Sequence, residues 1–182
     1  MSCRLYKWNE IICQKDYIYK LQSKTIYCIP KFEKIVVNLS NNDAINDPKQ
    51  MLVCLTAIEL LTNQKPVIYR STKSRSEFKL KKNSIIGVKV LLRNESIFQF
   101  LDTFIFMYLP KFSNNKGLIH NMYSKSIKSI SFGIKNLILF PQLNQSVRFK
   151  KILGCTFTIL MRQPTKSTSL VLSEYQLPQK FN

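Results

Sequence analysis

The chain has 182 residues, enough for one domain with appendages, and 45% of them are hydrophobic, which supplies a core. Its 28 lysines and arginines outnumber its 10 acids, so the net charge is +18 and the expected partner is nucleic acid or an anionic membrane. No apolar run reaches the roughly 18 residues that a membrane-spanning helix needs, which leaves nucleic acid as the favoured partner.

Composition also argues against metal and enzyme sites. The sequence has no glycine-rich phosphate loop, no paired histidines and no acidic cluster, so we expect neither an enzyme nor a cofactor. The only histidine, His120, is predicted to be an ordinary loop residue without neighbouring metal ligands. The cysteines are odd in number and far apart, which indicates free thiols in a reducing compartment: Cys3, Cys13, Cys28, Cys54 and Cys155.

The first elements are a helix, a strand and a second helix. A loose helical period predicts a helix over Leu5–Leu21, and β-branched residues predict a strand over Lys34–Leu39. Asp47 and Pro48 are a helix cap and a proline at the first helical position, so they predict a helix that ends at Asn63.

The most informative stretch, Gln64–Arg93, carries nine cations and one acid. Two apolar runs, Pro66–Tyr69 and Ile85–Leu92, are predicted to be strands, and the basic segment between them is predicted to be a long loop. Long loops in compact domains are usually functional or disordered. A loop of one charge sign on a rigid sheet suits a polyanion, although a solvated charged surface is the alternative.

Asn94 is predicted to cap a third helix, Glu95–Tyr108, that ends at Pro110. The helix is largely apolar and should therefore be buried. The remaining predicted elements are a loop over Lys111–Lys128, strands over Ser129–Ile134 and Cys155–Met161, and a short helix over Lys166–Tyr175.

This order of elements predicts an α+β fold, with one mostly antiparallel sheet, helices packed on one face and a long basic inter-strand loop. The other face of the sheet would be free to meet RNA. We expect an N-terminal helical segment over residues 1–23, an α+β domain over 24–163 and a C-terminal tail with a short helix over 164–182.

Several motifs follow one family in order and spacing over about residues 24–163. They are KFEKIVVNL (Lys31–Leu39), the Gln-Lys-Pro step with the basic loop and Ile-Gly-x-Lys-Val (Asn63–Arg93), FLDTFIFMYLPKF (Phe100–Phe112), the Lys116-Gly117-Leu118 step and ISFGIKNLILFPQL (Ile130–Leu143). They resemble large-subunit ribosomal protein five, the bacterial-type 5S rRNA-binding protein of the central protuberance.

The resemblance implies a structural constituent of the large ribosomal subunit that binds 5S rRNA, or its replacement, and large-subunit rRNA. It implies rRNA contacts at Asn38, Gln64, Lys65, Lys89 and Arg93. The family's loop that faces the peptidyl-site tRNA falls on Arg70–Lys82, with the candidates Arg70, Lys73, Arg75, Phe78, Lys79, Lys81 and Lys82. An intersubunit bridge to a small-subunit head protein falls near Lys111–His120 and Phe140–Gln145, with the candidates Lys111, Lys116, His120 and Gln142.

The sequence departs from the family pattern in two informative places. Ser40–Asp43 replaces a glycine-rich turn, and Asn94 replaces the glycine of an Arg-Gly-Glu step. Residues encoded by A/T-rich codons dominate, so a divergent organelle-encoded copy, in the mitochondrial ribosome of the matrix, is the preferred interpretation. The alternative is a free-standing organellar RNA-binding accessory protein. Asn38 and Gln64 could instead cap turns, and Tyr69 and Phe78 could stack on nucleotides.

Overall fold

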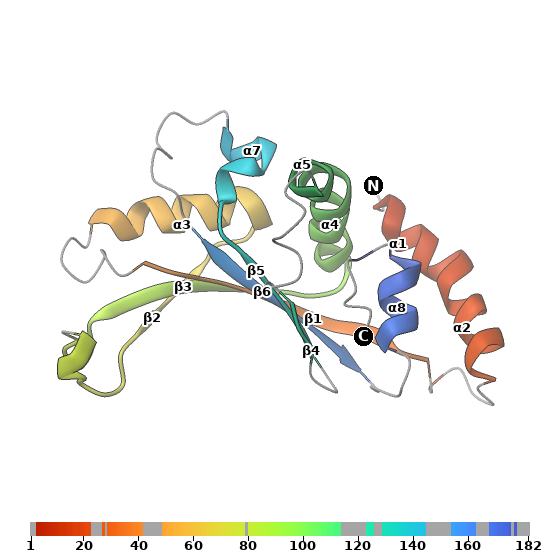
Figure 1. Cartoon of the computed structure of the whole chain (residues 1–182), viewed down its shortest axis with the longest axis horizontal. Coiled ribbons are helices and arrows are strands. Elements are labelled where there is room, and N and C mark those ends of the chain that lie inside the picture. The colour runs from red at the N-terminus through yellow and green to blue at the C-terminus, as the bar shows by residue number, and fades with distance from the viewer. Residues whose placement is uncertain are drawn as a thin grey trace. The chain divides into compact units, whose positions relative to one another are not determined.

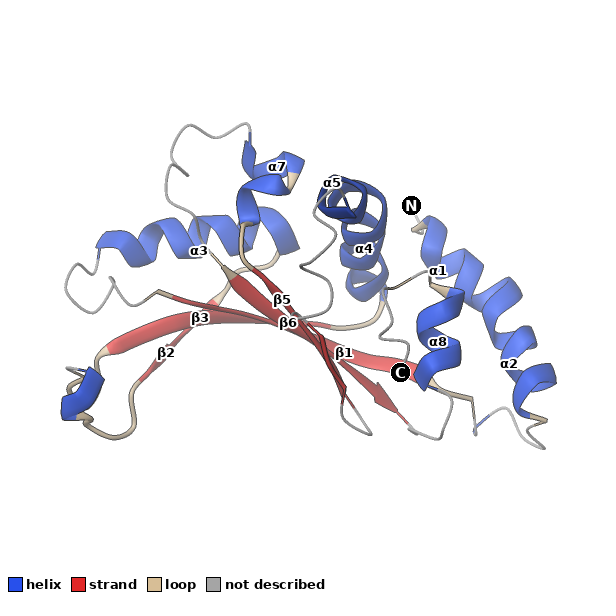
Figure 2. Cartoon of the chain, in the orientation of Figure 1, coloured by secondary structure: helices blue, strands red, loops and turns tan. Residues whose placement is uncertain are grey.

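The computed structural model describes residues 3–22, 27, 29–41, 49–78, 80–113, 123–125, 129–144, 154–162, 168–175 and 177. Six strands form a sheet in the order β2-β3-β1-β6-β5-β4, and helices accompany it, so the predicted α+β fold is confirmed (Figures 1 and 2). The β2–β3 and β4–β5 pairs are antiparallel. The strands are β1 Lys31–Ser40, β2 Val67–Arg70, β3 Ile85–Leu92, β4 Tyr123–Lys125, β5 Ser129–Ile134 and β6 Cys155–Arg162.

The chain divides into two compact units, and the strands β1, β3, β5 and β6 contribute to both. Unit 1 comprises residues 1–35, 92–132 and 158–182, and unit 2 comprises residues 36–91 and 133–157.

Unit 2 places two helices on one side of its strands (Figure 2). These are α3, Lys49–Thr62, and the short α7, Pro141–Asn144, which contact each other. Burial alternates along the strands: Val37 and Leu39 of β1 and Val88 and Val90 of β3 are buried, whereas the residues between them are half-buried or exposed. The alternation leaves one strand surface for the helical core and one for solvent.

Unit 1 is built on the N-terminal helical segment, which consists of α1 Arg4–Trp8, the π-helical turn η1 Asn9–Cys13 and α2 Gln14–Leu21. It packs against α4, Glu95–Thr103, and α8, Thr168–Glu174. Edge-to-face ring contacts fix this core: Tyr6 and Phe32 both contact Phe98, with centroid distances of 5.4 and 6.0 Å, and Phe32 also contacts Tyr175 at 5.0 Å. Such pairs add to the hydrophobic burial.

The prediction that the third helix ends at Pro110 is wrong. After α4 the chain forms a π-helical turn, η5 Phe104–Tyr108, and continues as α5, Leu109–Ser113. In that turn the Leu109 N–H bonds the Phe104 carbonyl, one residue further back than in an α-helix. This shift in the hydrogen-bond pattern lets the helix continue through Pro110. Proline lacks an N–H, and in a regular α-helix its ring would clash with the preceding turn.

Other local predictions also need correction. Asn94 occupies the cap position of α4, but its side chain makes no capping hydrogen bond and its φ of 53° is left-handed. The predicted loop over Lys111–Lys128 contains strand β4, and a short 3-10 turn at Leu137–Leu139 and α7 were not predicted. The predicted cap at Asp47 and Pro48 lies outside the described residues.

Candidate nucleic-acid interface

The basic loop is held at its base by main-chain hydrogen bonds between residues at its two ends. The β2–β3 register pairs Tyr69 with Gly87 and then shifts before Arg70. Beyond the strands, the Ser71 N–H donates to the Ser84 carbonyl at 2.9 Å and the Asn83 N–H donates to the Ser71 carbonyl at 3.0 Å. Ser71 is buried, and its hydroxyl bonds the Lys73 carbonyl. The loop therefore leaves the sheet in a defined direction.

The tip of the loop is a small closed turn. Arg75 and Leu80 exchange two backbone hydrogen bonds of 3.0 Å, and a 3-10 turn, Ser76–Phe78, lies between them. Phe78 is 59% exposed at this tip. An exposed aromatic ring on a basic loop is a typical stacking platform for a base.

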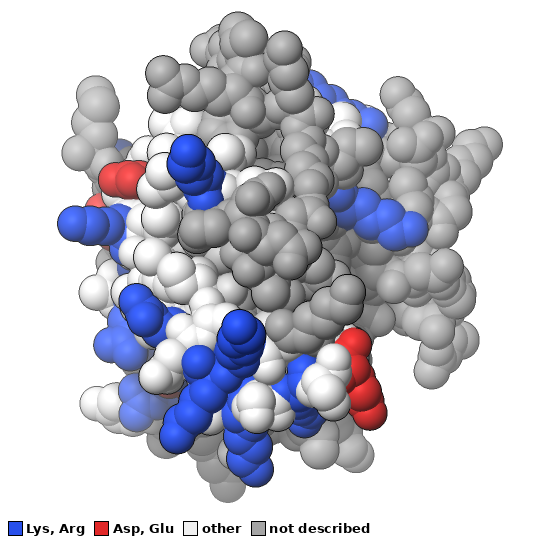
Figure 3. All heavy atoms as spheres, turned by 90° about the vertical axis from the view of Figure 1, so that its left-hand side faces the viewer, with Lys and Arg blue, Asp and Glu red and all other residues white. Residues whose placement is uncertain are grey.

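The side chains of the loop form a basic surface. All described lysines and arginines of the loop are exposed, and the loop contains one acid, Glu77. Figure 3 shows lysine and arginine side chains gathered on this face of the molecule. Among the residues that the structure describes, the two ion pairs, Arg4–Asp102 and Lys20–Glu174, lie in unit 1, away from the loop in sequence. The exposed loop cations are Arg70, Lys73, Arg75, Lys81 and Lys82.

Next to the loop, Asn38, Tyr69 and Gly87 meet on three neighbouring strands. Burial raises the pKa of Tyr69, and a hydrogen bond with the Asn38 side chain lowers it by a smaller amount. A hydrogen bond lowers the pKa of a phenol when it is donated to the phenol oxygen, so the Asn38 amide nitrogen is the donor. The Asn38 Oδ1 is buried and has no hydrogen-bond partner among the described residues. Gly87 makes room for this pair, because a Cβ there would lie 2.4 Å from the Tyr69 hydroxyl oxygen. Sequence reasoning considered Tyr69 only as a stacking ring and missed this contact.

Lys89 extends the same strand surface. It is exposed and pairs with Val67 across the β2–β3 ladder, two residues from the Tyr69–Gly87 pair. Because side chains two residues apart share a face of a strand, Lys89 lies on the side that bears Tyr69.

Gln64 and Lys65 follow the end of α3. Asn63 has a left-handed φ of 51°, and its N–H donates to the Glu59 carbonyl at 2.8 Å, so it terminates the helix. The buried Thr62 hydroxyl lies within hydrogen-bond range of the Ile58 carbonyl, at 2.8 Å, and of the Gln64 carbonyl, at 3.3 Å. This cap places half-buried Gln64 and exposed Lys65 at the entry to β2.

The other sequence-predicted residues are not all brought together. Arg93 and Lys111 are exposed but belong to unit 1, whereas Gln142 is exposed on α7 of unit 2. Lys79, Lys116 and His120 lie outside the described residues. The structure therefore groups Asn38 and Lys89 beside the base of the basic loop.

The described part of the chain offers no candidate metal site and no candidate membrane-spanning helix. No group of three His, Cys, Asp or Glu side chains there could hold a metal ion. None of the described helices has the length and apolar character to cross a membrane.

Comparison with known proteins identifies the family. A model described as ribosomal protein L5 matches residues 26–81, and one described as the ribosomal L5P family C-terminus matches residues 85–179. The chain belongs to the ribosomal protein L5 family. It is therefore a structural constituent of the large ribosomal subunit and not an enzyme.

The relatives match over most of their length. The chain is 34% identical to large ribosomal subunit protein uL5m of Reclinomonas americana over 177 residues, which are 96% of this chain and 97% of that protein. It is 37% identical to large ribosomal subunit protein uL5 of Aquifex pyrophilus over 142 residues, 78% of this chain and 74% of the relative. The uL5 of Mycoplasma mycoides subsp. mycoides is 31% identical over 153 residues, 84% of each chain.

Proposed function

We propose that the chain binds 5S rRNA, or an rRNA segment that replaces it, together with large-subunit rRNA in the central protuberance of a mitochondrial ribosome. Its basic loop contacts the peptidyl-site tRNA, and a separate region takes part in an intersubunit bridge. The mitochondrial assignment is supported by the match with the uL5m of Reclinomonas americana along almost the whole chain. The family membership supports a ribosomal role over a free-standing RNA-binding accessory protein.

The observation that carries the tRNA contact is the hydrogen-bonded base of the basic loop, together with the five cations that are exposed among its described residues. Phosphate contacts by lysine and arginine give affinity and position, and they require little base readout. A loop that is closed at its base and tip loses less conformational entropy on binding than a disordered segment would. Phe78 at the tip adds a ring that can stack on an unpaired base of the tRNA.

The 5S rRNA contact is supported by the surface beside the loop. Lys89 and Lys65 supply exposed cations, and half-buried Gln64 supplies an amide that can donate and accept hydrogen bonds. The Asn38 Oδ1 is buried and its amide nitrogen bonds Tyr69, so Asn38 holds Tyr69 within this surface and presents no accessible amide oxygen. Amides suit the base edges and 2′-hydroxyl groups of an RNA that is recognised mainly by its shape. The proposed bridge uses Lys111, Lys116, His120 and Gln142.

Salt dependence separates these two RNA surfaces. The full chain is titrated with a 5S rRNA transcript and with an elongator tRNA at several salt concentrations. Three pairs of substitutions remove two charges each: Lys81→Gln with Lys82→Gln in the loop, Lys65→Gln with Lys89→Gln beside it, and Lys7→Gln with Lys15→Gln on the exposed N-terminal helices as the control. Each lost phosphate contact should lower the salt slope by about one unit.

The loop pair should lower the slope by up to about two units with tRNA, and the Lys65 and Lys89 pair should do the same with 5S rRNA. The control pair should leave both slopes unchanged. If the control pair lowers the slopes as much as the other two pairs do, the affinity reflects net charge alone and the proposed surfaces are wrong.

A further inference from the structure

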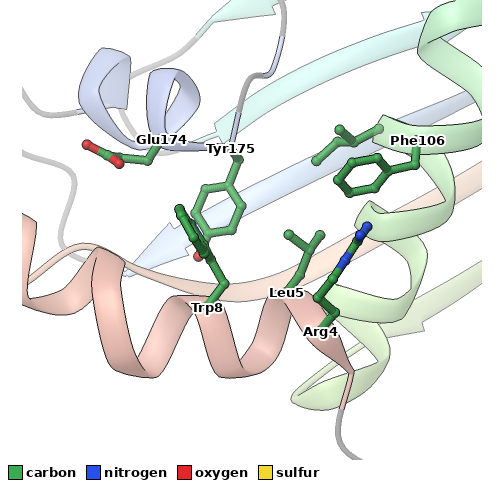
Figure 4. A pocket seen from close by; sticks show the side chains of 7 residues that line it. Arg4, Leu5, Trp8, Phe106, Glu174 and Tyr175 are labelled. Atoms are coloured by element: carbon green, nitrogen blue, oxygen red, sulfur yellow. The ribbon is translucent and has the colours of Figure 1, made fainter.

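Unit 1 contains a pocket that the RNA surfaces do not use. It has a volume of about 300 Å³ and lies between α1, η5 and the C-terminal end of α8 (Figure 4). Leu5, Ile105 and Tyr175 are buried and contribute its inner lining, whereas Trp8 and Phe106 remain 44% and 50% exposed. Both neighbouring helices carry a π-helical turn here, η1 after Trp8 and η5 around Phe106. Such turns occur frequently at functional sites.

The charged groups of the pocket are already paired. The Arg4 guanidinium donates to Asp102 Oδ1 at 3.0 Å and lies 4.0 Å from the centroid of the Phe106 ring. The Glu174 carboxylate pairs with Lys20. Both charges of the pocket therefore have partners within unit 1.

The polar atoms of the two other aromatic residues are engaged as well. The Tyr175 hydroxyl donates to Asn9 Oδ1 at 2.6 Å. Burial raises the pKa of the Cys13 thiol, and a hydrogen bond from the Trp8 indole N–H lowers it by less, so this N–H is also used within unit 1. What Trp8, Phe106 and Tyr175 offer to an occupant is apolar ring surface.

The charge around the pocket differs from that of the rest of the chain. The segments 4–21, 95–108 and 168–174, which line or support it, hold four of the 28 cations and five of the 10 acids, so their net charge is 4 − 5 = −1 in a chain of +18. The cations are Arg4, Lys7, Lys15 and Lys20, and the acids are Glu10, Asp16, Glu95, Asp102 and Glu174. A surface that binds RNA would instead carry more cations than acids.

We propose that this pocket is a protein-docking site of the assembled large subunit. Its occupant is an aromatic or branched aliphatic side chain from a basic segment of a neighbouring protein. The apolar lining takes the anchor side chain, and the acidic balance of the surrounding helices favours cations beside that anchor. A nucleobase is disfavoured because the surrounding helices lack the excess of cations that a surface for RNA carries. This docking site is additional to the proposed RNA contacts, because it is built from residues that those contacts do not use.

Photo-crosslinking from the pocket tests the proposal in intact large subunits. Phe106→p-benzoylphenylalanine places the reactive group at one wall, and Trp8→p-benzoylphenylalanine, at the facing half-exposed residue, is a second variant should the first fail to fold. Leu52→p-benzoylphenylalanine is the control, because Leu52 is a 62% exposed apolar residue on α3 of unit 2. Thermal unfolding of each free variant checks the fold. Binding of 5S rRNA by each variant checks the RNA surfaces independently.

The expected product is one protein adduct that resists nuclease, is degraded by protease and is absent from the Leu52 control. Its partner peptide should present an apolar residue with lysine or arginine nearby. An adduct to rRNA, an adduct to an acidic peptide, or no adduct from either folded variant in the assembled subunit would overturn the proposal. Because 5S rRNA binding is measured on the same variants, failure here is distinguishable from failure of the proposed RNA contacts.

Discussion

Gly87 lies directly against the hydroxyl group of Tyr69, its partner across the β2–β3 ladder. A Cβ at position 87 would lie 2.4 Å from the Tyr69 hydroxyl oxygen and 2.5 Å from the Leu39 carbonyl oxygen on the neighbouring strand β1. A tyrosine side chain could rotate away, but the backbone carbonyl could not without moving the strand. The absence of a side chain at Gly87 is thus what lets three strands approach at the base of the basic loop.

Gly87→Ala should therefore destabilise the protein. We expect a loss of about 1–3 kcal/mol in the free energy of unfolding, the range for overpacked sites, measured by chemical denaturation. Gly133→Ala is the matched control, because no atom lies within 4 Å of a Cβ at that strand position. Alanine there should be neutral or should stabilise by roughly 0.5–1 kcal/mol. Equal effects at the two glycines would contradict the close approach at Gly87.

The hydrogen bond between Tyr69 and Asn38 predicts a cost for Tyr69→Phe. The Asn38 Oδ1 already lacks a described partner, so removing the hydroxyl would leave the amide nitrogen unpaired as well. The expected loss of unfolding free energy is about 1–3 kcal/mol. Tyr19→Phe is the control, because Tyr19 is 83% exposed, and it should change the stability little. A Tyr69→Phe variant as stable as the parent chain would show that this bond contributes nothing.

Alkaline pH should weaken the fold through its buried thiols and phenols. Burial raises the pKa of Cys155 from 9.0 to about 12, and it also raises the pKa values of Tyr17 and Tyr175. Between pH 9.0 and about 12, the Cys155 thiol keeps its proton in the folded state but loses it in the unfolded state. The stability that this thiol contributes is therefore fully present below pH 9 and falls as the pH rises through this range. The contribution of Cys155 to the slope should be about 1.4 kcal/mol per pH unit.

Cys155→Ala isolates that contribution. The substitution shifts the whole stability curve because it leaves a cavity, but only the lost thiol changes its slope above pH 9. Denaturation at a series of pH values gives the free energy of unfolding against pH. For the variant, the slope of this curve should correspond to about one proton fewer than for the parent chain. Parallel curves for the two proteins would show that Cys155 titrates normally in the folded state.

The regular elements of the fold could be predicted because their periodicity is local. The buried residues of α3 recur at helical spacing, and β6 alternates buried side chains with exposed or half-buried ones, so each pattern indicates its own structure. The basic loop could be predicted for a similar reason, because its charged residues and the two apolar runs beside it are contiguous in sequence.

Features that depend on distant or unusual backbone contacts could not be predicted. Pro110 indicates a helix end, and only the π-helical turn before it explains why the helix continues. The φ of 53° at Asn94 explains why the family pattern has a glycine there, but the ψ of −130° lies outside the left-handed helical region that asparagine tolerates, so the residue is strained and its side chain does not cap the helix. The pocket of unit 1 joins Trp8, Phe106 and Tyr175, which no local pattern connects.

The central claim, that this chain is a constituent of the mitochondrial large ribosomal subunit, is tested most directly by sedimentation. Mitochondrial lysate is washed at high salt and separated on a gradient, and the chain is quantified by mass spectrometry relative to other large-subunit proteins. The account predicts that the chain remains with the large subunit in a constant ratio to those proteins. Its release into the soluble fraction, with the other proteins retained, would contradict the account and would favour a free-standing RNA-binding protein.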